Sequence, residues 1–156
     1  MYSEKIYESI LKILDNLGIE YRVDIYKGFI ILPHQTIARD FIPITGSVRI
    51  AVDNEDYTIV VSLEHFGISN LAATSEFLMR LNGILKFDKF LIDYDNLSVM
   101  GITCVRNNEN IVLKEDLVSE ISRIFGVFGD IYELLLKINI NVITPEMAIY
   151  QLEKLL

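Results

Sequence analysis

Three pairs of strand-like runs constrain the fold of this chain more than any other feature of its sequence. Within each run, apolar and polar residues alternate or β-branched residues cluster, as is typical of half-buried strands. A short polar or glycine-containing turn separates the two runs of each pair, so the sequence predicts three antiparallel hairpins. The pairs are Ile19–Ile25 with Phe29–Leu32, Val48–Val52 with Tyr57–Leu63, and Phe87–Tyr94 with Leu97–Val105.

Four segments have helical spacing, because their apolar residues recur every three or four positions. Thr144 is expected to cap the last of them, and Thr74 or Ser75 is available to cap the second. Two glycines, Gly126 and Gly129, are expected to bend or interrupt the third. The predicted helices are Ser3–Leu17, Leu71–Leu85, Leu113–Ile138 and Pro145–Leu156.

The order of these elements indicates an α+β fold. We expect an antiparallel sheet of hairpins with an N-terminal helix, a central helix and a long C-terminal helix packed on it, plus a short terminal helix. Pro33 is expected to end the first ladder, and His34–Gly46 to form a connection with a short edge segment. Residues 1–141 are expected to form one domain and residues 142–156 a C-terminal helical extension.

Composition excludes several classes of partner. The 156 residues are 51% hydrophobic, enough for one buried core, and the net charge is −8. The fourteen basic residues are scattered, so we expect no nucleic-acid partner. Apolar runs are far shorter than the roughly 20 residues of a membrane span, and the first residues have a helical pattern rather than a basic segment followed by an apolar run. We therefore expect a cytoplasmic protein without a membrane partner.

The segment Phe77–Val105 carries a family pattern. A helix with leucines and an asparagine leads into a strand, a turn and a partner strand, and a long helix follows. In this pattern the chain resembles the YbjN family and the related class I type III secretion chaperones. The matching residues are Leu81, Asn82, Leu85, Phe87, Lys89 and Phe90.

The resemblance implies a compact α+β fold of the secretion chaperone kind, frequent dimerisation, and a role in holding a partner polypeptide or regulating a process without catalysis. It extends over most of residues 1–138. The chain departs from the family pattern in two places. Asp88 stands where the family usually has glycine, and Pro145–Leu156 lies beyond the matching part.

Residues of the types used for metal binding and catalysis are present, but their spacing matches no known metal-binding or catalytic motif. His34, His65 and Cys104 match no metal-ligand pattern, and Cys104 is expected in the core. The carboxylates around Asp53 lack the register of a calcium loop, and Asp93 is expected to form a turn. No phosphate loop, dinucleotide fingerprint or nucleophile elbow is present. We therefore predict no metal, no cofactor and no catalytic site.

The terminal helix is apolar on more than one side over only twelve residues. One side is expected to pack on its own domain, and the other to contact a second subunit or a client. Simple docking in the core is an equally good interpretation. The candidate contact residues are Met147, Ile149, Tyr150, Leu152, Leu155 and Leu156. An unpaired edge strand near Ile37–Ile44 is a second candidate surface.

The leading hypothesis is a non-catalytic protein-binding module, an adaptor- or chaperone-like regulator that forms a homodimer and binds another polypeptide. One alternative is a small-ligand sensor with an apolar cavity between the long helix and the sheet, lined by Phe87, Phe125 and Phe128. A less favoured alternative is an enzyme that uses His34 or His65 as an acid–base group.

Overall fold

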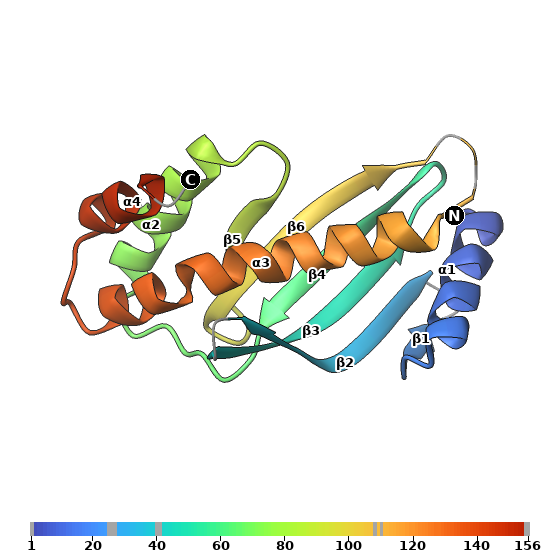
Figure 1. Cartoon of the computed structure of the whole chain (residues 1–156), viewed down its shortest axis with the longest axis horizontal. Coiled ribbons are helices and arrows are strands. Elements are labelled where there is room, and N and C mark those ends of the chain that lie inside the picture. Colours follow the sequence, from blue (N-terminus) through green and yellow to red (C-terminus); the bar gives the residue numbers. More distant parts are fainter. Residues whose placement is uncertain (1, 25–27, 40–41, 108, 110, 155–156) are drawn as a thin grey trace.

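The computed structural model describes residues 2–24, 28–39, 42–107, 109 and 111–154. Within these residues the chain forms four helices and one antiparallel sheet of six strands in the order β1-β2-β3-β4-β6-β5 (Figure 1). The predicted α+β class is confirmed. The elements are α1 (Glu4–Leu17), β1 (Arg22–Asp24), β2 (Phe29–Arg39), β3 (Ile42–Val52), β4 (Asp56–Leu63), α2 (Leu71–Ile84), β5 (Lys89–Asp93), β6 (Ser98–Arg106), α3 (Lys114–Asn139) and α4 (Pro145–Glu153).

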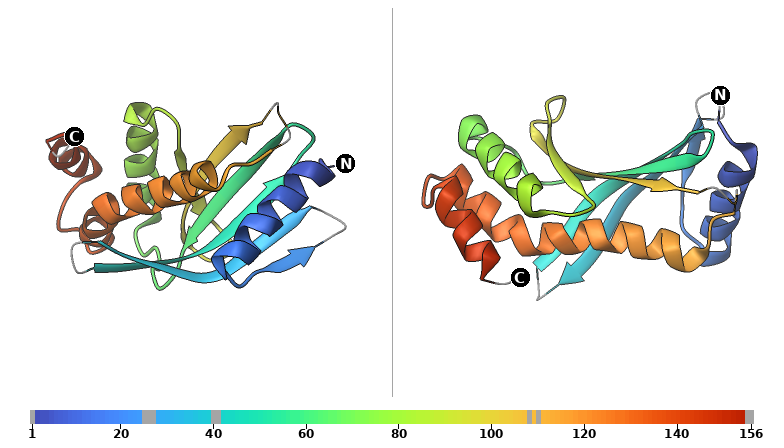
Figure 2. Two further views of the ribbon diagram at one scale, coloured as in Figure 1. Left: turned by 45° about the vertical axis from the view of Figure 1, so that its right-hand side comes forward. Right: turned by 90° about the horizontal axis from the view of Figure 1, so that it is seen from above.

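Helix α3 runs diagonally across one face of the sheet and covers it (Figures 1 and 2). The predicted interruption at Gly126 and Gly129 is wrong, because α3 is continuous over 26 residues. Its apolar stripe is wide and packs against the sheet and, towards the C-terminal end, against α2 and α4, which offsets the helix-weakening effect of the two glycines. The buried side chains of the helix are Leu117, Ile124, Phe125, Phe128, Ile131, Leu134, Leu135 and Ile138.

The sheet and α3 pack closely at Gly101 of β6. A Cβ atom added there would lie 2.7 Å from Ile124 Cγ2 and 2.8 Å from Phe90 Cε1. The Phe90 ring in turn meets Phe128 edge to face, with centroids 5.0 Å apart. Glycine at position 101 therefore creates the space that these two side chains fill, so that the helix and the sheet pack without a void.

Helix α1 packs beside the start of α3. The Ser9 hydroxyl accepts a hydrogen bond from Val112 N (3.1 Å) and donates one to Val112 O (3.2 Å). As its sequence predicts, α1 begins at the cap Ser3, whose hydroxyl accepts from Ile6 N, and ends at Gly18 in the left-handed conformation. Its apolar side joins the same core as α3.

The predicted connection at His34–Gly46 is wrong. β2 continues to Arg39 and pairs with β3, and the register is irregular only between Leu32 and Gln35. Pro33 is tolerated because it lies at this bulge, beyond the last residue of β2 that pairs with β1. The candidate edge near Ile37–Ile44 is present in part, because Gln35–Arg39 of β2 pair with β3 on one side while no described strand pairs with their other side. The predicted first strand is shorter, since β1 spans only Arg22–Asp24 and residues 25–27 lie outside the described part.

Helices α2 and α4 pack together at one end of the molecule (Figure 2). The cap of α2 is Asn70, whose side chain accepts from Ala73 N, and not the expected Thr74 or Ser75. Thr74 is fully buried one turn inside the helix. The cap of α4 is Thr144, as predicted. The prediction that residues 142–156 form a separate extension stays a prediction, although Ala148 and Leu152 lie in the common core.

Asn82 of α2 closes the outer edge of β5. Its side-chain oxygen accepts a hydrogen bond from Phe90 N (2.8 Å), and its amide nitrogen donates one to Phe90 O (2.9 Å). Phe90 is fully buried, so without Asn82 both main-chain groups would lack partners. The asparagine of the family pattern thus takes the place of a seventh strand at this point.

We expect Asn82→Leu to lower the free energy of unfolding by about 2 kcal/mol or more, because two buried main-chain groups lose their partners. Asn82→Asp keeps the acceptor for Phe90 N but loses the donor, so its effect should be intermediate. Urea unfolding followed by circular dichroism measures both. Asn16→Leu, at an exposed position of α1, is the matched control and should be close to neutral. An equally small effect at Asn82 would contradict this role.

Candidate protein-binding surface

The sheet has a second face that no helix of the described residues covers (Figure 2). Directly paired residues of neighbouring strands point to the same face, so the register identifies which side chains lie there. Phe90, Gly101 and Val61 form a row on the face under α3. The adjacent row therefore lies on the opposite face, which we call the open face. That row consists of Arg22, Ile31, Arg49, Val60, Ile102 and Lys89.

Apolar side chains gather on the open face. Ile31, Val60 and Ile102 are each partly exposed in the central row, and Met100 pairs with Leu91 in the next. Leu91 exposes 42% of its surface. The solvent side of an antiparallel sheet is usually polar, with apolar residues only on the core side. Strands that are apolar on both sides are typical of a sheet that is covered on both sides.

A shallow groove between α2 and β5 extends the open face at one edge. It holds about 420 Å³ and is lined by apolar side chains, among them Met79, Leu91, Tyr94 and Met100. Met79 and Tyr94 are among the most exposed apolar residues, at 71% and 68%. Because Leu91 and Met100 belong to both features, the groove and the apolar rows are continuous. Methionine side chains adapt to different partner shapes, which suits a binding surface.

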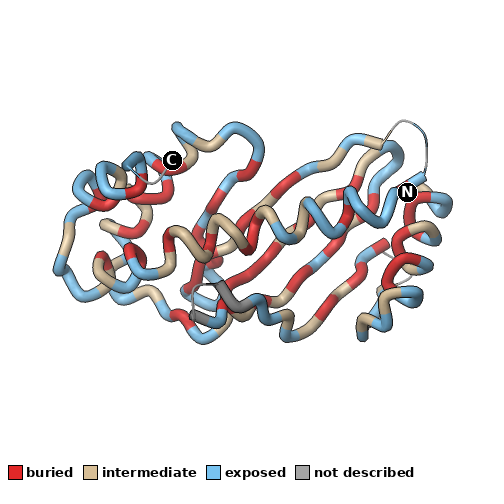
Figure 3. Tube along the Cα trace, viewed as in Figure 1, coloured by how far each residue is buried: buried red, intermediate tan, exposed pale blue. Residues whose placement is uncertain are grey.

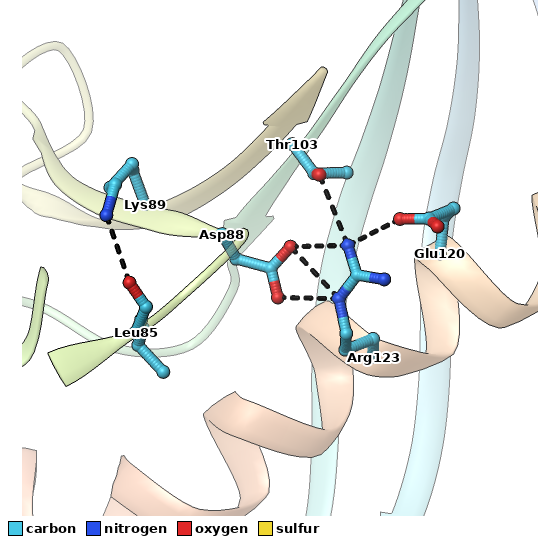
Figure 4. Close-up of polar contacts among 6 residues, drawn as sticks. All are labelled: Leu85, Asp88, Lys89, Thr103, Glu120 and Arg123. Carbon is cyan, nitrogen blue, oxygen red and sulfur yellow. Dashed lines mark hydrogen bonds and ion pairs between the residues drawn. The ribbon is translucent and has the colours of Figure 1, made fainter. Parts of the chain in front are cut away.

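Lys89 closes the end of α2 at the border of this groove. Its ammonium donates to Leu85 O (3.2 Å; Figure 4) and to Asn82 O (3.0 Å), two of the last carbonyls of the helix. A cation is favourable there because helix C-termini carry a partial negative charge. The lysine of the family pattern is therefore accounted for by a structural role.

Asp88 and Arg123 clamp α3 to the start of β5 (Figure 4). The guanidinium donates to both carboxylate oxygens, at 2.8 and 2.9 Å, and also contacts Thr103 and Glu120. Asp88 is buried, and its hydrogen bonds raise the pKa of Arg123 further above its already high ordinary value. Asp88, which stands where the family pattern usually has glycine, is thus paired with Arg123, and the pair has a structural role.

The structure separates the six terminal residues proposed as contacts. Leu152 is buried within the chain and Ile149 is half-buried, so they pack on their own domain. Met147 and Tyr150 are exposed, at 50% and 61%, beside Arg80 of α2. Leu155 and Leu156 lie outside the described residues. Of the six candidates, Met147 and Tyr150 are therefore the ones that the described part of α4 exposes on the surface.

The other singled-out residues do not assemble into a site. His34 Nδ1 lies 2.9 Å from Glu64 Oε2 at an exposed position, and both His34 and His65 have positive φ angles. Among the described residues, no three metal-ligating side chains come together. Asp93 forms the expected turn through Asn96 N and Nδ2. Cys104 was expected in the core but is exposed, because its register with Thr58 puts it on the open face.

The aromatic side chains proposed for a ligand cavity are arranged differently from the expectation. Phe125 and Phe128 are buried in the packed core between α3 and the sheet. Phe87 is exposed outside that core, and the Arg123 guanidinium lies 5.5 Å from its ring centroid. The three rings therefore do not line one cavity.

Sequence reasoning missed the open face, although a signal for it exists. Strand β6 has apolar residues at both odd and even positions, since Val99 lies on the α3 side of the sheet with Gly101, while Met100 and Ile102 point the other way. A strand of this composition indicates burial on both sides. This pattern alone does not predict a binding surface, because the second face of the sheet can be covered either by another segment of the same chain or by a partner.

Comparison with known proteins supports the fold. No protein-family profile matches the sequence, and no curated protein sequence matches it. Among solved structures, the chain is similar to YbjN, a proposed transcription regulator from E. coli, with a TM-score of 0.51 and 13% sequence identity. The alignment covers 75% of this chain and 81% of that one. The chain therefore has a YbjN-like α+β fold, as the sequence resemblance predicted. Among the described residues, no helix is both long and apolar enough to span a membrane.

We expect Arg123→Met to lower the free energy of unfolding by about 2 kcal/mol, because it leaves a buried carboxylate without its partner. The loss is smaller than for a fully buried pair, since the Arg123 side chain is 35% exposed. Adding Asp88→Ala to Arg123→Met should restore part of the loss, which a urea double-mutant cycle measures. Arg80→Met, in the exposed Arg80–Glu76 pair, is the control and should cost less than about 0.5 kcal/mol. Additive effects at positions 88 and 123 would contradict the clamp.

Proposed function

We propose that this protein is a non-catalytic polypeptide-binding module that acts as an adaptor- or chaperone-like regulator. The observation that supports it most is the open face of a sheet whose other face is covered. Val60, Ile102, Met100 and Leu91 form a continuous apolar area there, and Ile31 lies beyond Arg49. Such an area on a folded chain is typical of a surface that binds another protein.

Two further observations support binding over catalysis. The chemistry-bearing residues named above are engaged in turns or structural pairs, or are dispersed over the surface. The similar structure, YbjN, is described as a proposed regulator and not as an enzyme. We extend regulation by binding to this chain as part of the proposal, together with a cytoplasmic location.

Homodimerisation is a second part of the proposal. The candidate contact is the exposed side of α4, where Met147 and Tyr150 lie next to Arg80 of α2 and form a shallow hollow of about 470 Å³. Tyrosine and methionine are enriched where protein surfaces associate. This surface lies beside α2, so a dimer through α4 leaves most of the open face accessible to a different polypeptide.

The open-face proposal predicts that Val60→Thr combined with Ile102→Thr abolishes capture of the partner from a lysate of the native host. Threonine keeps the strand propensity but removes apolar contact, at a cost of about 2 kcal/mol or roughly thirtyfold in Kd. The captured protein is then purified and titrated calorimetrically against both forms. Val118→Thr, at an exposed position of α3, is the control and should bind normally. Equal affinity of the double variant would place the binding site elsewhere.

The dimer proposal predicts that Tyr150→Glu shifts the chain toward monomer at micromolar concentration, since a carboxylate would be buried at the contact. Sedimentation equilibrium measures the dimer dissociation constant. Tyr94→Glu, at a similarly exposed aromatic position away from α4, is the control and should leave that constant unchanged. A wild-type chain that sediments as a monomer throughout would refute this part and leave the open-face proposal intact.

A further inference from the structure

The charge of the open face differs from that of the molecule as a whole. The chain carries a net charge of −8, yet the strand positions on this face hold Arg22, Arg49, Lys89 and Arg106. The acidic residues of the face lie at the ends of strands, at positions 24, 56 and 93. Arg49, by contrast, is in the middle of β3, between Ile31 and Val60.

Arg22 and Arg49 are both exposed, and neither forms an ion pair or a side-chain hydrogen bond with any described residue. Lys89 is different, because its ammonium already binds the carbonyls at the end of α2. The central row therefore alternates apolar side chains with two cations that have no ion-pair partner within the described part of the chain. The surface is complementary to a partner that combines apolar and acidic residues.

The dimensions of the surface suit a helix. Neighbouring strands are about 4.8 Å apart, so β3 and β5 are separated by about 14 Å, which admits one helix of about 10 Å diameter. Seated between Arg49 and α2, such a helix would cover Val60, Met100 and Ile102. The seven paired residues of β4 and β6 run for about 24 Å, the length of about 16 helical residues.

We propose that the open face binds an acidic amphipathic helix of a partner protein, which forms a second helical layer opposite α3. The proposal rests on the binding function proposed above and specifies the chemistry of the partner. The apolar side of the helix packs on Val60, Met100 and Ile102, and its carboxylates on the side of β3 pair with Arg49. Arg22, two strands farther out, adds to the positive potential on that side. Helices on both faces of a sheet are a common layered arrangement in folded domains.

A second copy of the chain fits this surface less well. Two copies related by a twofold axis through the open face would bring Arg49 of each into one interface. The acidic residues of that face lie at the ends of strands, away from Arg49 in the middle of β3, and Asp93 is already bonded to Asn96. Like charges buried together without counter-charges are costly, so the electrostatics favour an acidic partner over self-association.

Cys104 makes the proposal directly testable. It is the single cysteine of the chain, and it lies exposed on the open face two residues from Ile102. A helix seated on β4 and β6 would shield its thiol. The rate at which iodoacetamide alkylates Cys104 therefore reports occupancy of this face without any added label.

The test uses 18-residue synthetic peptides with leucines at helical three–four spacing and either Glu or Lys at the other positions. A Glu peptide with the same composition but scrambled order is the control for amphipathicity. We expect the amphipathic Glu peptide to bind at least about tenfold more tightly than the Lys peptide at low salt, by fluorescence anisotropy, and to slow alkylation of Cys104. Arg49→Glu should reverse this preference, and Arg22→Glu should weaken it.

Lys12→Glu, on the exposed side of α1, is the matched charge reversal and should change neither result. The proposal is overturned if the Lys peptide binds equally well, if the scrambled peptide matches the amphipathic one, or if no peptide slows alkylation. Protection of Cys104 that depends only on protein concentration would indicate self-association instead. Failure of the peptides, with a native partner that still requires Val60 and Ile102, would refute the acidic helix but not the binding function.

Discussion

The close packing of α3 on the sheet is the interaction on which the rest of the structure depends. Gly101 removes a Cβ atom where Ile124 and Phe90 must fit, and Phe128 fills the space behind them. The Asp88–Arg123 pair joins the same helix to the entry of β5. Figure 3 shows the buried positions concentrated along the strands under this helix and on the inner sides of α1 and α2. The core is therefore one-sided, and its completion leaves the second face of the sheet exposed.

One-sided packing decides where a partner can bind. The β5 edge is closed at Phe90 by the side chain of Asn82, and the proline and bulge in β2 interrupt the opposite edge. Both features restrict the addition of an extended strand along an edge. The broad face has no such restriction. Binding through side chains across the face, with Arg49 providing selectivity by charge, follows from these features more directly than binding by strand addition.

The sequence predicted local structure well and long-range structure unevenly. The helices, the second and third hairpins and the cap Thr144 follow from periodicity and local hydrogen bonding, so they were predicted correctly. The strand that runs through Pro33 was not predicted. Pro33 lies at a bulge beyond the residues of β2 that pair with β1, so its missing N–H group costs no hydrogen bond to β1. Cys104 was misplaced for a related reason. Neighbouring residues in an apolar strand point to opposite faces of the sheet, and only the register with the next strand shows which residue points to which face.

The class of fold, the order of its elements and the absence of familiar catalytic motifs follow from the amino-acid sequence alone, because they depend on residues close together in the chain. The tertiary structure alone decided which face of the sheet α3 covers, that Leu152 is buried while Met147 and Tyr150 are exposed, and that Arg49 stands among apolar neighbours. These properties depend on pairing between residues far apart in the chain. The residues available to a partner are those that the pairing of distant segments leaves exposed. The periodicity of one strand does not show which residues these are.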